Sequence, residues 1–411
     1  MLDRCDLGTW LAVGLCARVF AEGQTPPLPP GRRLTAGREP RPRVVYLITS
    51  SGGWWGGAER QVRYLAETFR RRGWDVGIVS MLPSERSLAE LDGGRIRTAT
   101  LDMTQGVPDP RAVLKLRSLL SEWRPDVLHA HMVHANLLAR LSRLVIRTPA
   151  VISTIHNEDE GPQWRYLAYR MTDPLTDLTT AVSHRALEEA VRRGAAAKSR
   201  IVLVANGIRT EEYRDTGEAR SETRDALGLH GEFVWLAVGR LIEAKAYPNL
   251  ICAFANARAE HPAARLLIAG IGPLEEIIRT KVKEAGVEQS VELLGLRSDI
   301  PALMQAADGF VMSSAWEGLP MVLLEAGASS LPIVATDVGG SREAVLDGVS
   351  AMLVRPGDTD ALGDAMRRVM ALPAVERMAM GSAGRDHVSR GFDLERVADT
   401  WEELYREALR D

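Results

Sequence analysis

The sequence predicts an α/β protein that contains two doubly wound parallel-sheet domains. Its 411 residues exceed the roughly 250 at which a single hydrophobic core stops growing. From Arg43 onward, short β-branched runs alternate with longer amphipathic stretches, which is the pattern of βαβ units. The same pattern begins again near Phe233, so we expect a second sheet.

The individual elements follow from this alternation. In the first half we expect strands at 44–49, 76–80, 96–101, 127–131, 151–155, 178–182 and 201–204. In the second half we expect them at 233–238, 265–269, 291–294, 309–313, 333–335 and 351–354. Helical spacing of Leu394, Val397, Trp401, Leu404 and Ala408 predicts a terminal helix over 393–410.

These elements suggest four regions. Residues 1–42, which include a segment rich in proline, glycine and arginine, are predicted to be a flexible extension. A first domain is expected over 43–215, a second over 216–390, and a C-terminal helix that packs back on the first domain over 391–411. The segment 211–224 is dense in charge without an apolar period, so it is predicted to be a hinge or linker. Ligands of open α/β sheets bind beyond the carboxyl ends of the strands, so we expect the site in a cleft between the two domains.

Composition narrows the class of protein. With 45% apolar and 26% charged residues, the chain is expected to be globular, and a formal net charge of −3 does not suggest a nucleic-acid binder. Its three cysteines, Cys5, Cys16 and Cys252, lack the spacing of a zinc site or disulfide framework, which favours a reducing cytoplasm. The apolar run 11–20 is too short to span a membrane, and a signal peptide is the minor alternative for it.

A glycine-rich stretch follows the first predicted strand and leads into a helix. Gly56 and Gly57 would let the backbone approach a phosphate at the start of that helix, although a plain strand-to-helix turn is the alternative. Trp54 and Trp55 in the same turn are candidates for contact with an acceptor sugar or with lipid, and covering a domain edge is equally open.

Histidines close two strands of the first half. His129 and His131 are two residues apart and should share a face of their strand, while His156 follows the next strand. Zinc has to be considered, but no third and fourth ligand occurs at a useful spacing, and a structural role is the alternative. The helix that follows, which carries Arg140 and Arg143, is expected either to cover the sheet or to rest on anionic lipid.

Two positive side chains follow the first strand of the second half. Arg240 and Lys245, just after Gly239, could neutralise a diphosphate leaving group, and surface charge is the alternative. Gly270 and Gly272 follow the next strand, but they do not complete a dinucleotide fingerprint. Glu275 occupies the place of the third glycine, and the proline at 273 suits a helix start.

The most informative stretch runs from 310 to 327. A predicted strand is followed by a turn with Glu317, Gly318, Leu319 and Pro320, and then by a helix with Glu325. Two carboxylates eight residues apart could accept hydrogen bonds from the hexose and ribose hydroxyls of one donor. The backbone N–H groups at the helix start would point toward the same ligand.

Taken together, these motifs resemble those of the retaining GT-B glycosyltransferases of family 4, also called group 1. The similarity covers nearly all of 43–405, and an ordered set of motifs carries it. The set comprises Gly56-Gly-Ala-Glu59, His129-Ala-His131, Thr154-Ile-His156, Asn206-Gly-Ile208, Val238-Gly-Arg-Leu241 with Lys245, Gly270-Ile-Gly-Pro273, Arg297-Ser-Asp299, and the E-x7-E pair Glu317 and Glu325. Ala246 is a departure, since the family often has glycine there, and 327–330 differ from the usual small-residue run.

The resemblance implies a GT-B fold of two Rossmann-like domains that face each other across a cleft. It implies that Arg240 and Lys245 bind the diphosphate, that Glu325 binds the ribose, and that Glu317 with the following N–H groups binds the transferred sugar. Gly56 and Gly57 would approach the phosphates from the other domain, and His156 or His131 would lie near the sugar and acceptor hydroxyl. It further implies retention of anomeric configuration without a bound metal.

We therefore expect a hexosyltransferase that uses a UDP- or GDP-sugar and a glycan or lipid-linked acceptor in cell-surface polysaccharide or glycolipid synthesis. No cofactor is expected, because the nucleotide sugar is a substrate. The alternatives are a nucleotide-sugar epimerase or hydrolase on the same fold, and a non-catalytic nucleotide-sugar-binding module. The expected location is the cytoplasm, with peripheral contact with the inner membrane surface as an open alternative.

Overall fold

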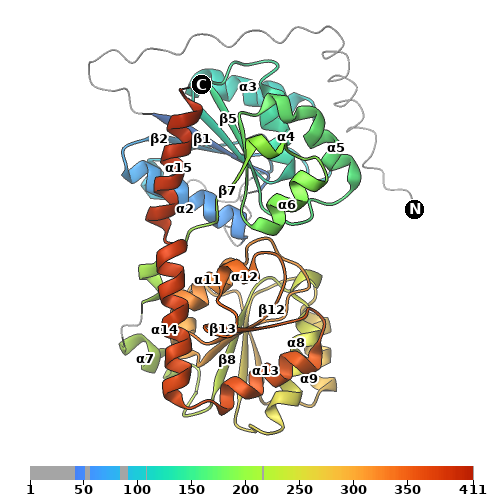
Figure 1. The fold of residues 1–411 in the computed structure, drawn as a ribbon, viewed down its shortest axis with the longest axis vertical. Coiled ribbons are helices and arrows are strands. Elements are labelled where there is room, and N and C mark those ends of the chain that lie inside the picture. Colours follow the sequence, from blue (N-terminus) through green and yellow to red (C-terminus); the bar gives the residue numbers. More distant parts are fainter. Residues whose placement is uncertain (1–41, 51–55, 84–90, 108, 215–216, 411) are drawn as a thin grey trace. The chain divides into compact units, whose positions relative to one another are not determined.

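The computed structural model describes residues 42–50, 56–83, 91–107, 109–214 and 217–410. They divide into two compact units (Figure 1). The first unit contains the residues up to Ala205 together with those from Val397 onward, and the second contains Asn206–Arg396. The division between Ala205 and Asn206 lies before the predicted domain boundary at 215 and 216.

The first unit is a seven-stranded parallel sheet in the order β3-β2-β1-β4-β5-β6-β7. Its strands are β1 (Arg43–Ile48), β2 (Asp75–Ser80), β3 (Arg97–Thr100), β4 (Val127–His131), β5 (Ala150–Ile155), β6 (Leu178–Ala181) and β7 (Ile201–Leu203). Its helices are α2 (Gly57–Arg71), α3 (Arg111–Trp123), α4 (Val133–Ser142), α5 (Gln163–Thr172), α6 (His184–Arg192) and, from Val397 onward, α15 (Leu394–Ala408).

The second unit is a six-stranded parallel sheet in the order β10-β9-β8-β11-β12-β13. Its strands are β8 (Val234–Val238), β9 (Arg265–Ala269), β10 (Val291–Gly295), β11 (Gly309–Met312), β12 (Ile333–Thr336) and β13 (Ala351–Val354). Its helices are α7 (Glu218–Ala226), α8 (Tyr247–Arg258), α9 (Glu275–Glu284), α10 (Ile300–Ala306), α11 (Met321–Ala328), α12 (Ser341–Ala344), α13 (Thr359–Ala371) and α14 (Ala374–Gly391).

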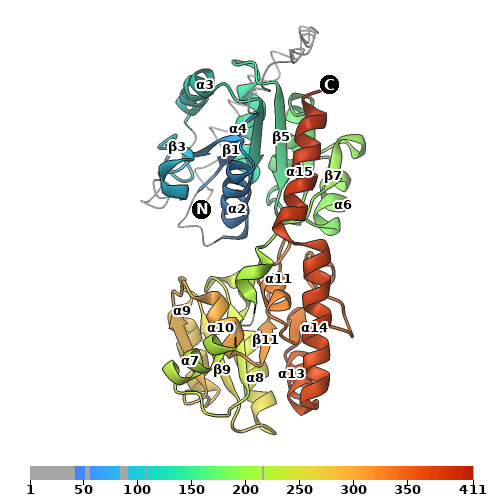
Figure 2. The ribbon, with the colours of Figure 1, turned by 90° about the vertical axis from the view of Figure 1, so that its left-hand side faces the viewer.

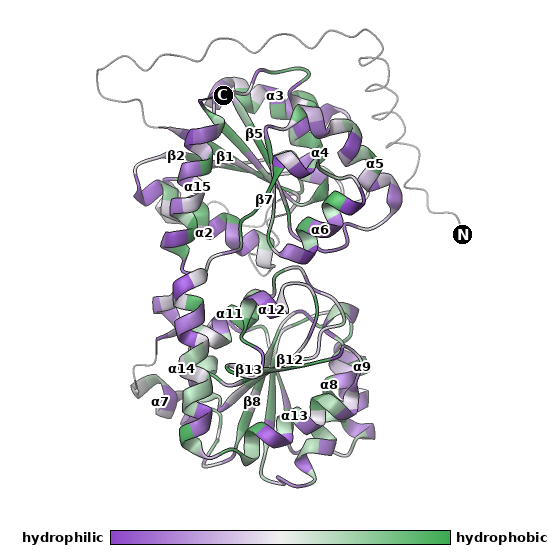
Figure 3. Cartoon of the chain, in the orientation of Figure 1, coloured by the Kyte–Doolittle hydropathy of each residue, from purple (hydrophilic) through white to green (hydrophobic). Residues whose placement is uncertain are grey.

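The fold class predicted from the sequence is confirmed. Each predicted strand is present, and its ends differ from the prediction by at most one residue. The strands are predominantly hydrophobic, as Figure 3 shows, because helices cover both faces of a doubly wound sheet. The helix expected after the glycine-rich stretch is α2, in which Leu65, Ala66 and Phe69 are fully buried.

The charged segment after the first unit is not the linker that its composition suggested. From Glu218 to Ala226 it forms α7, and two of its arginines bind the end of α10 and Asp308. Arg220 donates to the carbonyl oxygens of Gln305 and Ala307 at 2.7 Å. These charges therefore satisfy helix-terminal carbonyl groups that would otherwise lack partners, so the segment is part of the second unit.

Helix α15 runs along the first unit (Figure 2). Aromatic side chains make the contact. Trp401 is 2% exposed, as expected from the helical pattern, but the next large buried residue is Tyr405 rather than Leu404. The ring centroids of Tyr405 and Phe69 of α2 lie 5.2 Å apart, and Arg72 at the end of α2 pairs with Glu402 at 3.0 Å.

Candidate active site

The strand order of the second unit reverses direction between β8 and β11. Later strands are added on one side of β8 as far as β10, and β11 then returns to its other side. Loops that leave adjacent strands at such a reversal diverge, and ligands of open α/β sheets bind there. The loop after β8 carries Arg240 and Lys245, and the loop after β11 carries Glu317.

The structure brings Lys245 and Glu317 into direct contact. The Lys245 ammonium lies 2.5 Å from Glu317 Oε1, and the two side chains are only 17% and 16% exposed. Ser314 donates a second hydrogen bond to the same oxygen at 2.7 Å. Arg240, in contrast, is exposed and forms no ion pair within the described part of the chain. The site thus holds one neutralised and one available positive charge.

The glycines of this site have a steric role that the sequence did not reveal. A Cβ atom at Gly270 would lie 1.9 Å from the carbonyl oxygen of Gly239, and one at Gly272 would lie 2.4 Å from that of Leu241. At Gly239 it would lie 3.0 Å from Cε of Lys245. These residues therefore allow the loops after β8 and β9 to pack directly on each other.

The turn before α11 is also tightly packed. Gly318, Leu319 and Pro320 are all buried, and the carbonyl oxygen of Gly318 accepts a hydrogen bond from the backbone N–H of Gly340 at 2.6 Å. Glu325 lies on α11 with 1% of its surface exposed. The predicted helix is confirmed and runs from Met321 to Ala328.

Four residues that support this site were missed in the sequence. Ser314 holds Glu317, as described above. Ser313 donates to the carbonyl oxygen of Lys245 at 2.8 Å, and Tyr247 donates to that of Gly239 at 3.0 Å. A Cβ atom at Gly339 would lie 2.3 Å from the carbonyl oxygen of Glu317. The available signal was that polar or glycine residues follow β11 and β12 directly, as they do after β8 and β9.

In the first unit, Gly56 and Gly57 occupy the start of α2, directly before the helix and at its first residue. A Cβ atom at Gly56 would lie 1.9 Å from Oε2 of Glu59, so the absence of a side chain lets this carboxylate fold over the helix start. Such a carboxylate favours the positive end of the helix dipole. Trp54 and Trp55 lie outside the described residues.

The predicted histidines form one buried cluster in the first unit. His129 and His131 are 0% and 1% exposed, and their ring centroids are 4.0 Å apart, so they share a face of β4 as expected. His131 Nδ1 lies 2.9 Å from Nε2 of His156, which follows β5. Burial lowers the pKa of His156 to about 4 and that of His131 well below its usual range, so both imidazoles are neutral near pH 7.

His131 retains one unsatisfied ring nitrogen. Its Nε2 atom is buried and has no hydrogen-bond partner in the part of the chain that the structure describes. His129 has both ring nitrogens bonded, to Tyr405 and Thr154 at 2.7 Å. His129 therefore has a structural role, whereas His131 and His156 remain candidates for contact with a ligand.

Arg140 of α4 is a core residue and not a lipid contact. Its side chain is 0% exposed and donates to Ser153, Thr179 and the carbonyl oxygen of Tyr169. Arg143 pairs with Asp177 at 2.8 Å. Of the two roles expected for this helix, the structure supports the one in which it covers the sheet, since the Arg140 side chain is oriented into the protein.

Neither a metal centre nor a membrane span emerges from the described residues. Within them, no group of three or more histidine, cysteine or acidic side chains is placed to hold a metal ion. No helix in the same residues is both long enough and apolar enough to cross a bilayer.

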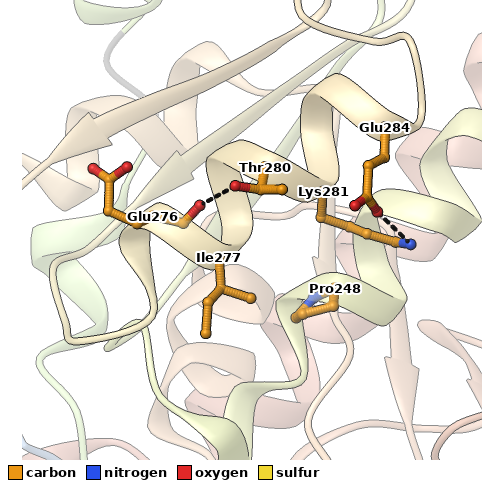
Figure 4. A pocket seen from close by; sticks show the side chains of 6 residues that line it. All are labelled: Pro248, Glu276, Ile277, Thr280, Lys281 and Glu284. Carbon is orange, nitrogen blue, oxygen red and sulfur yellow. Dashed lines mark hydrogen bonds and ion pairs between the residues drawn. The ribbon is translucent and has the colours of Figure 1, made fainter.

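A surface hollow between α8 and α9 is separate from the predicted site. Figure 4 shows its lining residues, which are Pro248, Glu276, Ile277, Thr280, Lys281 and Glu284. Lys281 is already paired with Glu284 at 3.2 Å. None of the site residues expected from the sequence lines this hollow.

Two doubly wound parallel α/β units are the architecture of the GT-B class, and solved glycosyltransferases share this fold. Two family models match the chain, Glycosyltransferase Family 4 over residues 55–212 and Glycosyl transferases group 1 over residues 219–387. The chain belongs to this family of glycosyltransferases.

Known relatives cover most of the chain. An Escherichia coli UDP-Gal:alpha-D-GlcNAc-diphosphoundecaprenol alpha-1,3-galactosyltransferase is 24% identical, over 73% of this chain and 80% of its own length. A glycogen synthase of Mycobacterium tuberculosis is 26% identical, over 86% of this chain and 92% of its own length. The crystal structure of Anabaena HepE in complex with UDP-glucose has a TM-score of 0.79 at 22% identity, with 89% of this chain and 99% of that one covered.

Proposed function

We propose that this glycosyltransferase moves a hexose from a UDP- or GDP-sugar to a glycan or lipid-linked acceptor, with retention of anomeric configuration. The observation that carries the proposal is the meeting of Lys245 and Glu317 at the switch point of the second unit. The Lys245 ammonium, which can bind a diphosphate, is hydrogen-bonded to the Glu317 carboxylate, which can accept hydrogen bonds from sugar hydroxyls.

In this proposal, different residues of the second unit bind different parts of the nucleotide sugar. Arg240 and Lys245 neutralise the diphosphate, which becomes more negative as the bond to the sugar breaks. Glu317 and the backbone N–H groups of Gly318, Leu319 and Met321 bind the transferred hexose, and Glu325 binds the ribose. Because two side-chain cations supply the positive charge, the proposed reaction needs no bound metal and no cofactor.

The first unit supplies the acceptor side in this proposal. His131 and His156 are neutral, so they can exchange hydrogen bonds with a sugar or acceptor hydroxyl without adding charge. Retention is assigned to front-face displacement, in which a phosphate oxygen helps to deprotonate the acceptor hydroxyl.

The names of relatives support both the proposed nucleotide-sugar donor and the proposed lipid-linked acceptor. A UDP-Gal-dependent galactosyltransferase and a Mycobacterium tuberculosis GDP-mannose-dependent phosphatidylinositol monomannoside mannosyltransferase are similar over 73% and 71% of this chain. Each name includes a lipid-linked acceptor. We therefore place the reaction in cell-surface polysaccharide or glycolipid synthesis, in the cytoplasm and in peripheral contact with the membrane where the acceptor resides.

Donor binding can be tested first and sugar transfer second. A panel of nucleotide sugars is first screened by thermal shift, since a ligand that binds only the folded protein raises its stability with concentration. Purified Glu317→Gln and Lys245→Ala are then assayed with the donor that binds and with lipid-linked acceptors. Both should lose most of the transfer activity, whereas Lys281→Ala, which removes a surface ion pair away from the site, should retain it.

The assay also distinguishes the alternatives. Release of free sugar or formation of an epimer without acceptor would indicate a hydrolase or epimerase, and binding without turnover of any kind would indicate a non-catalytic module. Wild-type turnover by both Glu317→Gln and Lys245→Ala would show that the site assignment is wrong.

A further inference from the structure

The ion pair between Lys245 and Glu317 is built into the fold of the second unit. Ser313 donates to the carbonyl oxygen of Lys245 at 2.8 Å, and the backbone N–H of Ala315 donates to that of Ala244 at 2.8 Å. The loops after β8 and β11 are therefore fastened to each other on both sides of the pair. This places the ammonium against the carboxylate through backbone geometry and not through a chance encounter of two flexible side chains.

The pair is also largely shielded from water. Its two side chains are 17% and 16% exposed, so salt and water screen their attraction less than in a surface ion pair. Ser314 donates to the same carboxylate oxygen at 2.7 Å and would remain bound to Glu317 if the ammonium left. The Lys245 ammonium is therefore held by Glu317, a carboxylate that competes with any anionic ligand for it.

A diphosphate that binds Lys245 has to take the ammonium away from Glu317. The carboxylate is then left in a partly shielded position close to a second negative group, which is unfavourable. A nucleotide sugar compensates for this loss, because hydroxyl groups of its hexose can donate to Glu317 in place of Lys245. A nucleoside diphosphate without a sugar has no such donors.

We propose that Glu317 is an internal competitor for Lys245 that disfavours the nucleoside diphosphate product relative to the sugar-bearing donor. This inference rests on the proposed function, which places the diphosphate at Lys245 and the hexose at Glu317. Its consequence is that Glu317 promotes release of the spent nucleotide in addition to binding the sugar.

The test is a double-mutant cycle on nucleotide binding. Isothermal titration with UDP and with GDP is performed on wild type, Glu317→Gln, Lys245→Ala and the double variant. The nucleotide that binds should bind Glu317→Gln more tightly than wild type by roughly fivefold, the size expected for releasing a cation from a weakly screened ion pair. Lys245→Ala should bind it more weakly, and adding Glu317→Gln to Lys245→Ala should give a clearly smaller gain.

Titration with the matching nucleotide sugar provides the second arm. Glu317→Gln should bind it no more tightly than wild type, so the preference for donor over product should fall. Glu317→Asp keeps the charge but withdraws it by one methylene, and it should bind the nucleoside diphosphate with intermediate affinity. This variant, with circular dichroism of each protein, also covers the case in which Glu317→Gln does not fold.

The outcomes separate this inference from the proposed function. If wild type binds UDP or GDP and Glu317→Gln binds it equally or less tightly, the competition is absent although the donor site stands. The inference also fails if the gain is as large in the Lys245→Ala background, because simple repulsion by the carboxylate would then explain it. If wild type binds neither nucleotides nor nucleotide sugars, the proposed function fails and this inference fails with it.

Discussion

The Nδ1 atom of His129 on β4 lies 2.7 Å from the hydroxyl oxygen of Tyr405 on α15. Both side chains are 0% exposed, and 276 residues of chain separate them. The bond links the C-terminal helix to the centre of the first sheet. His129 Nε2 continues the chain of contacts to Thr154, which in turn contacts Thr180 at 2.8 Å.

Replacing Tyr405 by phenylalanine should destabilise the first unit. The substitution keeps the ring packing against Trp401 and Phe69 but leaves Nδ1 of His129 buried without its partner, at a cost of about 1 to 3 kcal/mol. Urea unfolding followed by tryptophan fluorescence measures the loss. Tyr46→Phe is the matched control and should cost clearly less, because its hydroxyl lies 3.4 Å from that of Tyr405, which is a weak contact. Equal losses in the two variants would contradict this account.

Glu160 should make the stability of the first unit depend on pH. Burial raises its pKa to about 7, although Tyr169 and Asn157 donate hydrogen bonds to it. Because the folded state binds this proton more tightly, the stabilising contribution is complete below the unfolded pKa near 4.5 and is lost as pH rises through 7. At pH 8, Glu160→Gln should therefore unfold at a higher urea concentration than wild type, and its free energy of unfolding should be greater by up to about 3 kcal/mol. This difference should disappear near pH 4.5.

The comparison with Glu160→Gln has to be made at each pH, because His131 and His156 act in the opposite direction. Burial lowers the pKa of both imidazoles, so the unfolded state binds their protons more tightly. Their contribution to the free energy of unfolding is fully present above the unfolded pKa near 6.5 and is lost as the pH falls through the folded pKa, which is about 4 for His156. Both histidines remain in the variant, and the difference between the two curves isolates Glu160. A difference that does not change between pH 4.5 and pH 8 would show that the carboxyl is not perturbed.

Arg224 should stabilise the second unit although it lies in a strongly charged segment. Its guanidinium is 13% exposed, pairs with Asp308 at 3.1 Å and donates to the carbonyl oxygens of Ala306 and Glu232. Arg224→Ala leaves these acceptors partly buried and should cost about 2 kcal/mol. Arg214→Ala removes a surface pair with Glu211, both of which are at least 70% exposed, and should cause no measurable change in urea unfolding. If the segment were a linker, neither variant would change the free energy of unfolding.

The sequence predicted the strands well because their cause is local. Buried parallel strands need short apolar runs, and such runs are visible without knowledge of their partners. The same holds for Lys245 and Glu317, since both lie in loops that follow strands the sequence identifies, although their contact depends on the order of strands in the sheet. That order is a tertiary property.

What the sequence concealed depends on contacts between distant segments. Leu404 and Tyr405 lie three and four residues after Trp401, so helical spacing allows either one to be buried, and the partner His129 selects Tyr405. The burial of Arg140 was not predicted, because nothing local shows that Ser153 and Thr179 bind it inside the unit. Ser314 is inconspicuous for the same reason, since its function is set by the position of Glu317.

Ala246 adopts a backbone conformation that favours glycine, which accounts for the glycine that the family often has at this position and implies that alanine here is destabilising. Its φ and ψ are 46° and 40°, in the left-handed region, directly before α8 begins. An L-residue there costs roughly 1 to 2 kcal/mol, while glycine loses about 0.5 to 1 kcal/mol more entropy on folding, so Ala246→Gly should stabilise the second unit by about 0.5 to 1 kcal/mol. Urea unfolding tests this against Ala253→Gly, a buried position within α8 where the same change should destabilise by about 1 kcal/mol or more. If Ala246→Gly were instead less stable than wild type, the left-handed conformation at this turn would not be the one the protein adopts.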